Sequence, residues 1–240
     1  MAQRILLTGA SRGLGAALAR ALAAQGHVLT LVARDEARLN EVAAQCRALG
    51  AAAVKAAVHV AALDLSQPQG LLARVEALDA QAGGFDVVIN NAGSGHYRSF
   101  LAEDEASLRL QTDLHLTAPM LIARAVLPGM LARQRGYFIQ VASDIARRPL
   151  AQMSPYVAAK HGLLGFSGSL LREFKDQGIR VTTVLPGMID SDFNGGKTGE
   201  KGPRWALQVD ELAQEIARLL TLPDHWVIDE WQAHAIGQPL

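Results

Sequence analysis

Short apolar runs alternate along the chain with longer segments in which apolar residues recur at helical spacing. The short runs are rich in Val, Ile and Leu and cover residues 4–9, 27–33, 56–64, 85–90, 136–143, 179–186 and 225–231. The segments that predict helices cover residues 13–25, 35–49, 67–82, 103–132, 155–177 and 209–222. Nearly continuous apolar strands that alternate with helices indicate a parallel sheet covered on both faces. The pattern therefore predicts an α/β fold, with a doubly wound sheet built from these seven runs.

The length and composition of the chain indicate the number of domains and the classes of partner. The 240 residues contain no Pro/Ser-rich linker, so residues 1–240 are predicted to form a single domain, and half of them are apolar. Lys plus Arg equals Asp plus Glu at 23 each, with no basic run, which disfavours nucleic acid and anionic membranes as partners.

The location of the protein is predicted from three features. Cys46 is the single cysteine, which suits a reducing compartment. The start of the chain leads directly into a strand, without the apolar block of a signal peptide. The richest apolar stretch is interrupted by Arg124 and Pro128. We expect a cytoplasmic protein that does not span a membrane.

Glycine and polar residues follow the ends of several predicted strands. Gly9 follows the first strand, Asp64 the third, "NNAG" (90–93) the fourth, and "PG" (186–187) the sixth, while Ser143 ends the fifth. Doubly wound sheets bind ligands beyond the carboxyl ends of their strands. These positions are therefore the candidates for a binding site.

The first strand leads through a glycine turn into a helix over residues 6–23. Gly9, Gly13 and Gly15 allow a tight turn, close approach of the backbone to a pyrophosphate, and close helix packing. Their spacing is GxxxGxG, and a glycine loop in this position of a βαβ unit indicates nucleotide binding.

Tyr156 and Lys160 lie one helical turn apart in "SPYVAAKHG" (154–162), so their side chains share a helix face. An ordinary solvated helix edge would have the same spacing. Taken with the motifs above, however, the pair is part of a resemblance. The segments "TGASRGLG" (8–15), "NNAG", "YVAAK" (156–160) and "PGMIDS" (186–191), with Ser143 ahead of Tyr156, resemble the short-chain dehydrogenase/reductase family over roughly residues 3–192.

That resemblance implies a Rossmann-like fold and an NAD(P)-dependent oxidoreductase that interconverts CH–OH and C=O groups of a small carbonyl or alcohol substrate. Tyr156 would be the acid/base. Lys160 would lower the tyrosine pKa from about 10 and hold the nicotinamide ribose. Ser143 would orient the substrate oxygen, although a serine that simply ends a strand is the alternative.

The cofactor-binding residues implied by the resemblance come from every one of these motifs. They are Thr8, Gly9, Ser11, Arg12, Gly13, Leu14, Gly15, Arg34, Asp64, Leu65, Asn91, Ala92, Gly93, Tyr156, Lys160, Pro186, Gly187, Ile189 and Ser191. Asn90 and Asn91 are also expected to tie neighbouring strands together. No metal-ligand spacing occurs among the seven histidines.

The end of the second strand predicts the cofactor. Ala33 stands where NAD enzymes place an acid, Arg34 follows it, and Arg12 adds a second positive charge that could pair with a 2′-phosphate. NADP(H) is therefore expected. The alternative is that Arg34 belongs to a solvated helix face and that Asp35 serves NAD(H).

His115 departs from the family pattern, which has asparagine at this position. Pro119 cannot donate to the His115 carbonyl, so that carbonyl is left free to hold a relay water. The imidazole would add bulk or a group that titrates near physiological pH. Two alternatives stay open: a packing histidine beside a weakened relay, and direct proton shuttling by the imidazole.

The segment after the sixth predicted strand is expected to form part of the substrate pocket. A mobile substrate loop is expected at about 188–208, with Met153, Met188, Phe193 and Trp205 as candidate apolar walls. His96 and Tyr97 are given no catalytic role.

Five small residues in the segment 155–177 suggest a close helix contact in a homodimer or homotetramer, namely Ala158, Ala159, Gly162, Gly165 and Gly168. The leading functional hypothesis is an NADPH-dependent reductase of a small ketone, aldehyde or 3-oxoacyl-type carbonyl. An NAD-dependent alcohol dehydrogenase and a nucleotide-binding regulatory protein are the alternatives.

Overall fold

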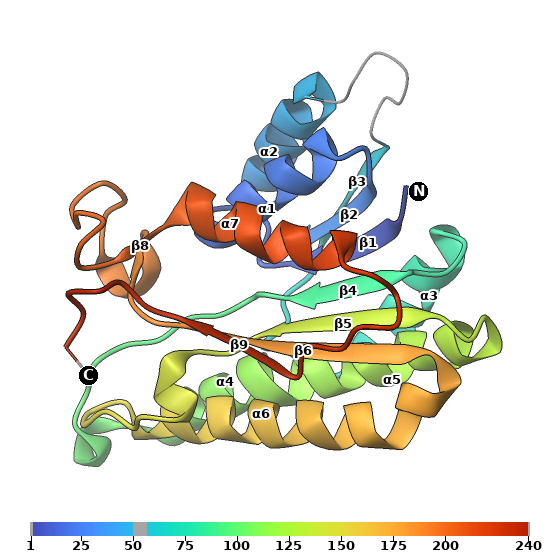
Figure 1. Ribbon diagram of the computed structural model, residues 1–240. Coiled ribbons are helices and arrows are strands. Elements are labelled where there is room, and N and C mark those ends of the chain that lie inside the picture. Colours follow the sequence, from blue (N-terminus) through green and yellow to red (C-terminus); the bar gives the residue numbers. More distant parts are fainter. Residues whose placement is uncertain (1, 50–56, 240) are drawn as a thin grey trace.

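The computed structural model describes residues 2–49 and 57–239, and these form a parallel sheet of seven strands in the order β3-β2-β1-β4-β5-β6-β9 (Figure 1). The predicted fold class is thereby confirmed. The first residue of the third predicted strand, residue 56, lies outside the described part of the chain. The strands are β1 (Arg4–Thr8), β2 (Val28–Ala33), β3 (Val58–Ala62), β4 (Val87–Asn90), β5 (Gly136–Val141), β6 (Ile179–Pro186) and β9 (Glu230–Ala233).

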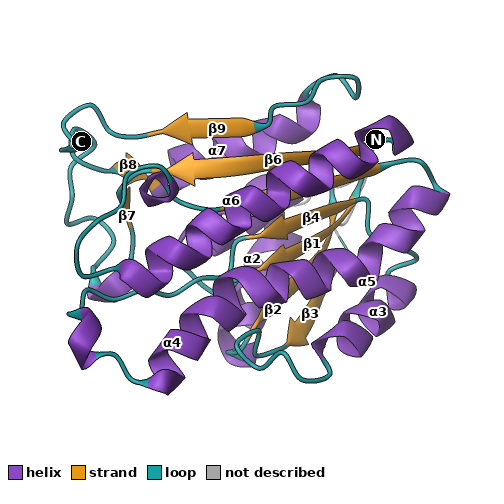
Figure 2. Cartoon of the chain, turned by 90° about the horizontal axis from the view of Figure 1, so that it is seen from below, coloured by secondary structure: helices purple, strands orange, loops and turns teal. Residues whose placement is uncertain are grey.

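Helices cover both faces of the sheet (Figures 1 and 2). One face carries α1 (Gly13–Ala24), α2 (Glu36–Leu49) and α7 (Val209–Arg218). The other carries α3 (Leu71–Gln81), α4 (Glu105–Thr112), α5 (Ala118–Ala132) and α6 (Ser154–Phe174). In Figure 1, α1, α2 and α7 lie above the sheet, and α4, α5 and α6 lie below it.

Alternate strand residues divide between the two layers of the core. Ile5 and Leu7 of β1 pack in the layer beneath α1 and α7, whereas Leu6 packs in the opposite layer. The same division separates Ile139 from Phe138 in β5. Because strand side chains alternate between faces, a run that is apolar at every position fits a sheet buried on both sides.

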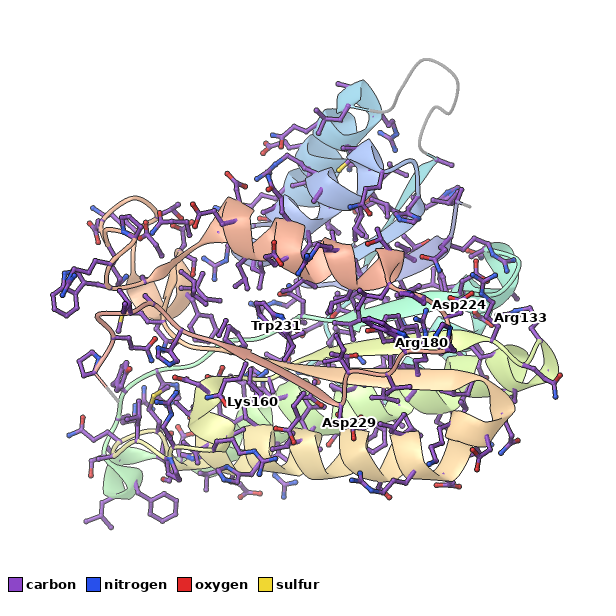
Figure 3. All side chains as sticks on the ribbon, viewed as in Figure 1. Arg133, Lys160, Arg180, Asp224, Asp229 and Trp231 are labelled. Carbon is purple, nitrogen blue, oxygen red and sulfur yellow. The ribbon has the colours of Figure 1, made fainter. Side chains whose placement is uncertain are left out.

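The last strand begins later than the sequence predicted. A turn precedes it, closed by a hydrogen bond from the Trp226 N–H to the Pro223 carbonyl at 2.9 Å. The Arg180 guanidinium lies 4.3 Å from the centre of the Tyr137 ring and pairs with Asp224 at 3.3 Å, which holds this turn beside β6 (Figure 3). Alternation in this apolar segment was therefore a poor guide to where pairing starts.

The helix predicted over residues 103–132 is interrupted. Between α4 and α5 the chain makes a π-helical turn over Asp113–Thr117, closed by a hydrogen bond from the Ala118 N–H to the Asp113 carbonyl. Pro119 has no N–H, which favours such a change of hydrogen-bonding pattern just before it. By length and hydropathy the run Glu105–Ala132 would suffice to cross a membrane, but α5 packs in the core against α3.

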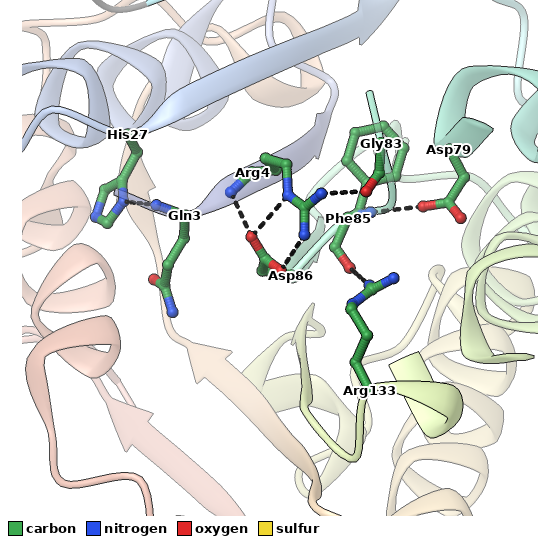
Figure 4. A network of polar contacts seen from close by, with 8 residues as sticks. All are labelled: Gln3, Arg4, His27, Asp79, Gly83, Phe85, Asp86 and Arg133. Atoms are coloured by element: carbon green, nitrogen blue, oxygen red, sulfur yellow. Dashed lines mark hydrogen bonds and ion pairs between the residues drawn. The ribbon is translucent and has the colours of Figure 1, made fainter. Parts of the chain in front are cut away.

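Polar contacts join the amino ends of the strands, opposite the edge where ligands are expected (Figure 4). Asp86, just before β4, accepts hydrogen bonds from the Arg4 main-chain N–H at 2.9 Å and from Arg4 Nε at 3.0 Å, and pairs with Nη2 at 2.8 Å. Arg4 also donates to the Gly83 carbonyl, and Arg133 donates to the Phe85 carbonyl at 2.7 Å. These contacts set the start of β4 against the start of β1.

The small residues predicted to form a helix-contact face do not all face outward. Ala158 and Gly165 are exposed, but Ala159 is buried. At Gly162 a Cβ atom would lie 2.8 Å from Leu116 Cδ2, so this glycine allows α6 to approach the π-helical turn of the same chain. At least part of the small-residue pattern therefore serves internal packing.

We predict that Asp86→Asn lowers the free energy of unfolding by about 2 kcal/mol, because it weakens charge-assisted bonds at a partly buried ion pair. Asp210→Asn is the matched control, since its carboxylate is 78% exposed and pairs with Arg20 at 3.4 Å. The control should cost no more than about 0.5 kcal/mol. Urea unfolding of both variants measures the difference, and equal effects would contradict the role given to Asp86.

Candidate active site

A cavity of about 840 Å³ lies along the carboxyl ends of the strands. Most of the residues predicted from sequence line it: Gly9, Ser11, Arg12, Gly13, Leu14, Gly15, Arg34, Asp64, Leu65, Asn91, Ala92, Gly93, Ser143, Tyr156, Pro186, Gly187, Ile189 and Ser191. Thr8, His115 and Lys160 do not reach the cavity wall and lie behind it. The volume is within the range of small-molecule sites, about 300–1,000 Å³.

The glycine turn between β1 and α1 leaves main chain exposed to the cavity. Gly9 has a φ of +67°, and a Cβ there would lie 2.7 Å from Ala92 Cα. A Cβ on Gly15 would lie 2.0 Å from the Gly9 carbonyl oxygen. Glycine is therefore required at both positions, and the amino end of α1, which has no side-chain cap, faces the cavity near Arg12.

Thr8 acts behind the cavity by joining β1 to β4. Its hydroxyl oxygen accepts hydrogen bonds from the main-chain N–H groups of Asn91 and Ala92, each at 3.0 Å. The Asn91 side-chain amide donates back to the Thr8 carbonyl at 3.0 Å. Asn90 donates to Gln140 of β5 at 3.0 Å, so the two asparagines tie their strand to both neighbours.

Three arginines line the cavity, and we call the part of the wall that contains them the arginine end. They are Arg12 of the glycine turn, Arg34 after β2, and Arg38 in the first turns of α2. Asp35 also lines this end, but its carboxylate accepts from the Arg38 N–H at 3.0 Å and pairs with Arg38 Nε at 3.3 Å. Arg38 was missed in the sequence because it is visible only as one of many charges on a solvated helix.

Asp64 follows β3 at the same end. Its carboxylate accepts hydrogen bonds from the Ser66 N–H at 3.0 Å and the Ser66 hydroxyl at 2.6 Å. These bonds close the turn after the strand and place Leu65 and Ser66 in the cavity wall. Ser66 was not predicted, since nothing in its sequence environment separates it from an ordinary turn serine.

A second part of the site, which we call the tyrosine end, brings together four residues from three elements. Ser143 follows β5, Tyr156 and Lys160 lie on the buried face of α6, and His115 belongs to the π-helical turn. The imidazole ring of His115 meets the Tyr156 ring edge-on, with ring centres 4.9 Å apart. Lys160 Nζ lies 5.6 Å from the centre of the Tyr156 ring and donates to the Val141 carbonyl at 2.7 Å.

Burial determines the charges at the tyrosine end. It raises the pKa of Tyr156 well above its usual value; the Ser143 hydroxyl opposes this rise and the Asp144 carboxylate adds to it. Burial also lowers the pKa of Lys160 to about 7. Loss of hydration thus disfavours the charged forms of both groups, and the expectation that Lys160 lowers the tyrosine pKa stays a prediction.

His115 is fully enclosed, and its Nε2 lies 2.6 Å from the carbonyl oxygen of Ser94. Nε2 also lies 3.3 Å from the Ser94 N–H, but the shorter contact with a carbonyl, which only accepts, assigns the proton to Nε2, so that nitrogen does not accept from the N–H. Nδ1 has no hydrogen-bond partner among the residues that the structure describes. Burial and the nearby Lys160 charge lower the pKa of His115 well below its usual value. The expectation of a group that titrates near physiological pH is thus wrong, and the imidazole is neutral.

The predicted substrate loop is anchored along its length. Ile189–Asp190 (β7) pairs with Leu207–Gln208 (β8), and the buried Asp190 carboxylate accepts from the N–H groups of Gly199 and Lys201 at 2.9 and 3.1 Å. Of the expected apolar walls, Met153, Met188 and Phe193 line the cavity. Trp205 does not, and it is half exposed, so that expectation is wrong.

Sequence reasoning also missed two polar residues of the tyrosine end, Asp144 and Gln238. Gln238 comes from the C-terminal segment, where no motif marks it. Tyr97, assigned no role, lines the cavity with a largely exposed ring, whereas His96 pairs with Glu103 at 2.7 Å.

Residues 3–201 match the family model described as "short chain dehydrogenase". The chain is 30% identical over 204 residues to the 3-oxoacyl-[acyl-carrier-protein] reductase of Vibrio cholerae, covering 85% of this chain and 80% of the reductase.

Two solved structures share the fold over nearly their whole length. The alcohol dehydrogenase of the archaeon Thermococcus sibiricus, complexed with 5-hydroxy-NADP, superposes with a TM-score of 0.91 at 27% identity, covering 100% of this chain and 99% of that one. The L-sorbose reductase of Gluconobacter frateurii, complexed with NADPH and L-sorbose, superposes with a TM-score of 0.86 at 28% identity, covering 100% and 98%.

The depressed pKa of His115 predicts how stability depends on pH. Below about pH 6.5 the unfolded chain binds a proton on this histidine that the native state does not, so the free energy of unfolding falls as pH falls. His115→Asn should reduce this slope, measured by urea unfolding between about pH 5 and pH 8. His59→Asn, which removes an exposed imidazole on β3, is the control and should keep the wild-type slope. Equal slopes for wild type and His115→Asn would contradict the prediction.

Proposed function

Because the chain belongs to the short-chain dehydrogenase family, and is thus an NAD(P)-dependent oxidoreductase, we propose that it uses NADPH to reduce a small carbonyl compound to an alcohol. Ketones, aldehydes and 3-oxoacyl-type compounds are the proposed substrate class. One observation carries this proposal: a single cavity joins a cluster of arginines to a buried tyrosine and a serine hydroxyl.

The cavity suits a dinucleotide at each of its parts. Gly9 and Gly15 let the turn pack directly against Asn91 and Ala92, and the uncapped amino end of α1 then faces the cavity, where a pyrophosphate would bind. Asp64 and Leu65 would flank the adenine. Pro186, Gly187, Ile189 and Ser191, after β6, would line the nicotinamide.

The arginine end supports NADP(H) as the cofactor. Arg34 and Arg12 offer guanidinium groups that would bind a 2′-phosphate through charge-assisted hydrogen bonds. Asp35, the candidate acid for NAD(H), is engaged with Arg38. Arg38 is a third candidate partner of the phosphate.

When bound, the nicotinamide cofactor supplies the hydride that adds to the carbonyl carbon. The protein must then supply a proton to the carbonyl oxygen. Tyr156 is suited to this step, because burial keeps its phenol protonated. Ser143, whose hydroxyl lies in the same part of the wall, would hydrogen-bond the substrate oxygen and orient it toward the phenol.

Lys160 and His115 act behind Tyr156 in this proposal. Lys160 can pass protons near neutral pH, since burial brings its pKa to about 7. The neutral imidazole of His115 fixes the tyrosine ring through its edge-on contact and adds no charge to the site. Of the roles that the sequence left open for His115, this one is closest to that of a packing histidine.

We predict that Tyr156→Phe lowers kcat by about 10²–10⁴, because the proton donor is lost. Binding of NADPH, followed by its fluorescence, should change little. Tyr137→Phe is the matched control: it removes a buried phenol that bonds Thr182 at 2.7 Å, outside the cavity wall, and should retain activity. A fully active Tyr156→Phe enzyme would show that another group delivers the proton.

We also predict that Arg34→Asp reverses the cofactor preference. The substitution removes a positive charge from the 2′-phosphate position and offers a carboxylate to a ribose hydroxyl, so KM should rise at least about tenfold for NADPH and fall for NADH. Arg74→Asp, on the exposed surface of α3, is the control and should leave both KM values unchanged. If Arg34→Asp also leaves them unchanged, the arginine end does not select the cofactor.

A further inference from the structure

A buried carboxylate lies beside the serine that is proposed to bind the substrate oxygen. Asp144 directly follows Ser143 in the chain, is only 6% exposed, and lines the same cavity as Ser143 and Tyr156. Burying a carboxylate costs free energy unless hydrogen bonds or charges compensate it. Its presence in the wall of the site therefore calls for an explanation beyond packing.

The two carboxylate oxygens of Asp144 are not equally satisfied. Oδ2 accepts a hydrogen bond from the Gln238 side-chain amide at 2.8 Å and lies 3.6 Å from Arg148 Nη2. Oδ1 accepts a longer hydrogen bond from the Ser143 hydroxyl, at 3.3 Å, and it would lose this donor when the hydroxyl turns to a substrate carbonyl. Since each carboxylate oxygen can accept two hydrogen bonds, Oδ1 keeps acceptor capacity next to Ser143.

Gln238 holds this carboxylate in place from a distant part of the chain. Its amide nitrogen donates to Asp144, while its carbonyl oxygen accepts from the Met188 N–H at 2.7 Å. The C-terminal segment thereby connects the turn after β5 to the base of the substrate loop. With Oδ2 held by Gln238, Oδ1 is the oxygen left for a ligand.

We infer that Asp144 selects carbonyl substrates that carry a hydroxyl group on the carbon next to the carbonyl. The inference rests on the function proposed above and names the substrate class for that site. The carbonyl oxygen of the substrate would bind Ser143 and Tyr156. A hydroxyl on the next carbon would then lie about as far from that carbonyl oxygen as Asp144 Oδ1 lies from Ser143 Oγ, which is 3.3 Å. It would donate to Oδ1 in a charge-assisted hydrogen bond.

The charge of Arg148 and the apolar side chains of the cavity wall narrow the class of substrates further. Arg148 partly balances the carboxylate, which favours a neutral hydroxyl over an ammonium group as the donor. Ile145, Leu150 and Met153 line the cavity nearby and leave an apolar surface for the rest of the substrate. The hydroxyl does not react: hydride adds to the carbonyl carbon, the Tyr156 proton goes to its oxygen, and the product is a vicinal diol.

The test compares four small ketones with NADPH: hydroxyacetone, methoxyacetone, aminoacetone and, as the unsubstituted reference, acetone. The methoxy group of methoxyacetone withdraws electrons from the carbonyl much as the hydroxyl of hydroxyacetone does, but it has no proton to donate. For wild type, kcat/KM for hydroxyacetone should exceed that for methoxyacetone at least about tenfold. In Asp144→Asn, which is nearly isosteric, this ratio should fall toward one.

Asp210→Asn is the matched control and should keep the wild-type ratio, because its carboxylate lies on the surface of α7. Gln238→Ala provides a second variant in which the Asp144 charge remains. Here KM for hydroxyacetone should rise and the ratio should fall part of the way, as expected of a positioning residue. Circular dichroism of each variant verifies that it is folded.

The outcomes are distinguishable. A wild-type ratio near one, or a ratio unchanged in Asp144→Asn, overturns the inference while leaving carbonyl reduction intact. A preference for aminoacetone over hydroxyacetone would also overturn it, since the donor would then be a cation. No turnover of any ketone in the panel overturns the inference, and the proposed function fails with it only if aldehydes and 3-oxoacyl compounds are not reduced either.

Discussion

The contact between the carboxyl ends of β1 and β4 is the constraint on which the site depends. The Thr8 hydroxyl accepts from two successive N–H groups after β4, and Asn91 returns a hydrogen bond to the end of β1. This brings Gly9 so close to Ala92 that only a residue without a Cβ fits. The same approach turns the main chain of the glycine turn toward the cavity. The binding surface and the close approach of the two strand ends are thus consequences of one set of hydrogen bonds.

Loss of hydration is the second organising effect, and it acts on three neighbouring groups at once. Tyr156, Lys160 and His115 are all buried, and for each of them burial disfavours the charged form. The site therefore holds a protonated phenol, a lysine that titrates near neutrality and a neutral imidazole. Such a site is suited to giving a proton to a carbonyl oxygen, and a positively charged cofactor or a bound substrate would shift these values in turn.

Distant segments complete both ends of the cavity. The arginine end combines the glycine turn with the start of α2, and the tyrosine end combines the turn after β5 with a glutamine from the C-terminal segment. The π-helical turn supplies His115 from beneath the wall. The sheet contributes by placing these loops along one edge, since all seven strands run parallel.

The sequence by itself determined the alternation of strands and helices, the glycine turn and the shared helix face of Tyr156 and Lys160, because these depend on local spacing. It also indicated that Pro119 leaves the His115 carbonyl without its usual helical donor, but not that the chain forms a π-helical turn there. Only the tertiary structure decided the protonation states, which follow from burial, and the pairing of Asp144 with Gln238, which lies 94 residues further along the chain. The tertiary structure alone also decided that Arg38 lines the cavity and that β9 starts late. Spacing along a chain does not specify which distant side chains exclude water from one another, and that exclusion determines the chemistry of this site.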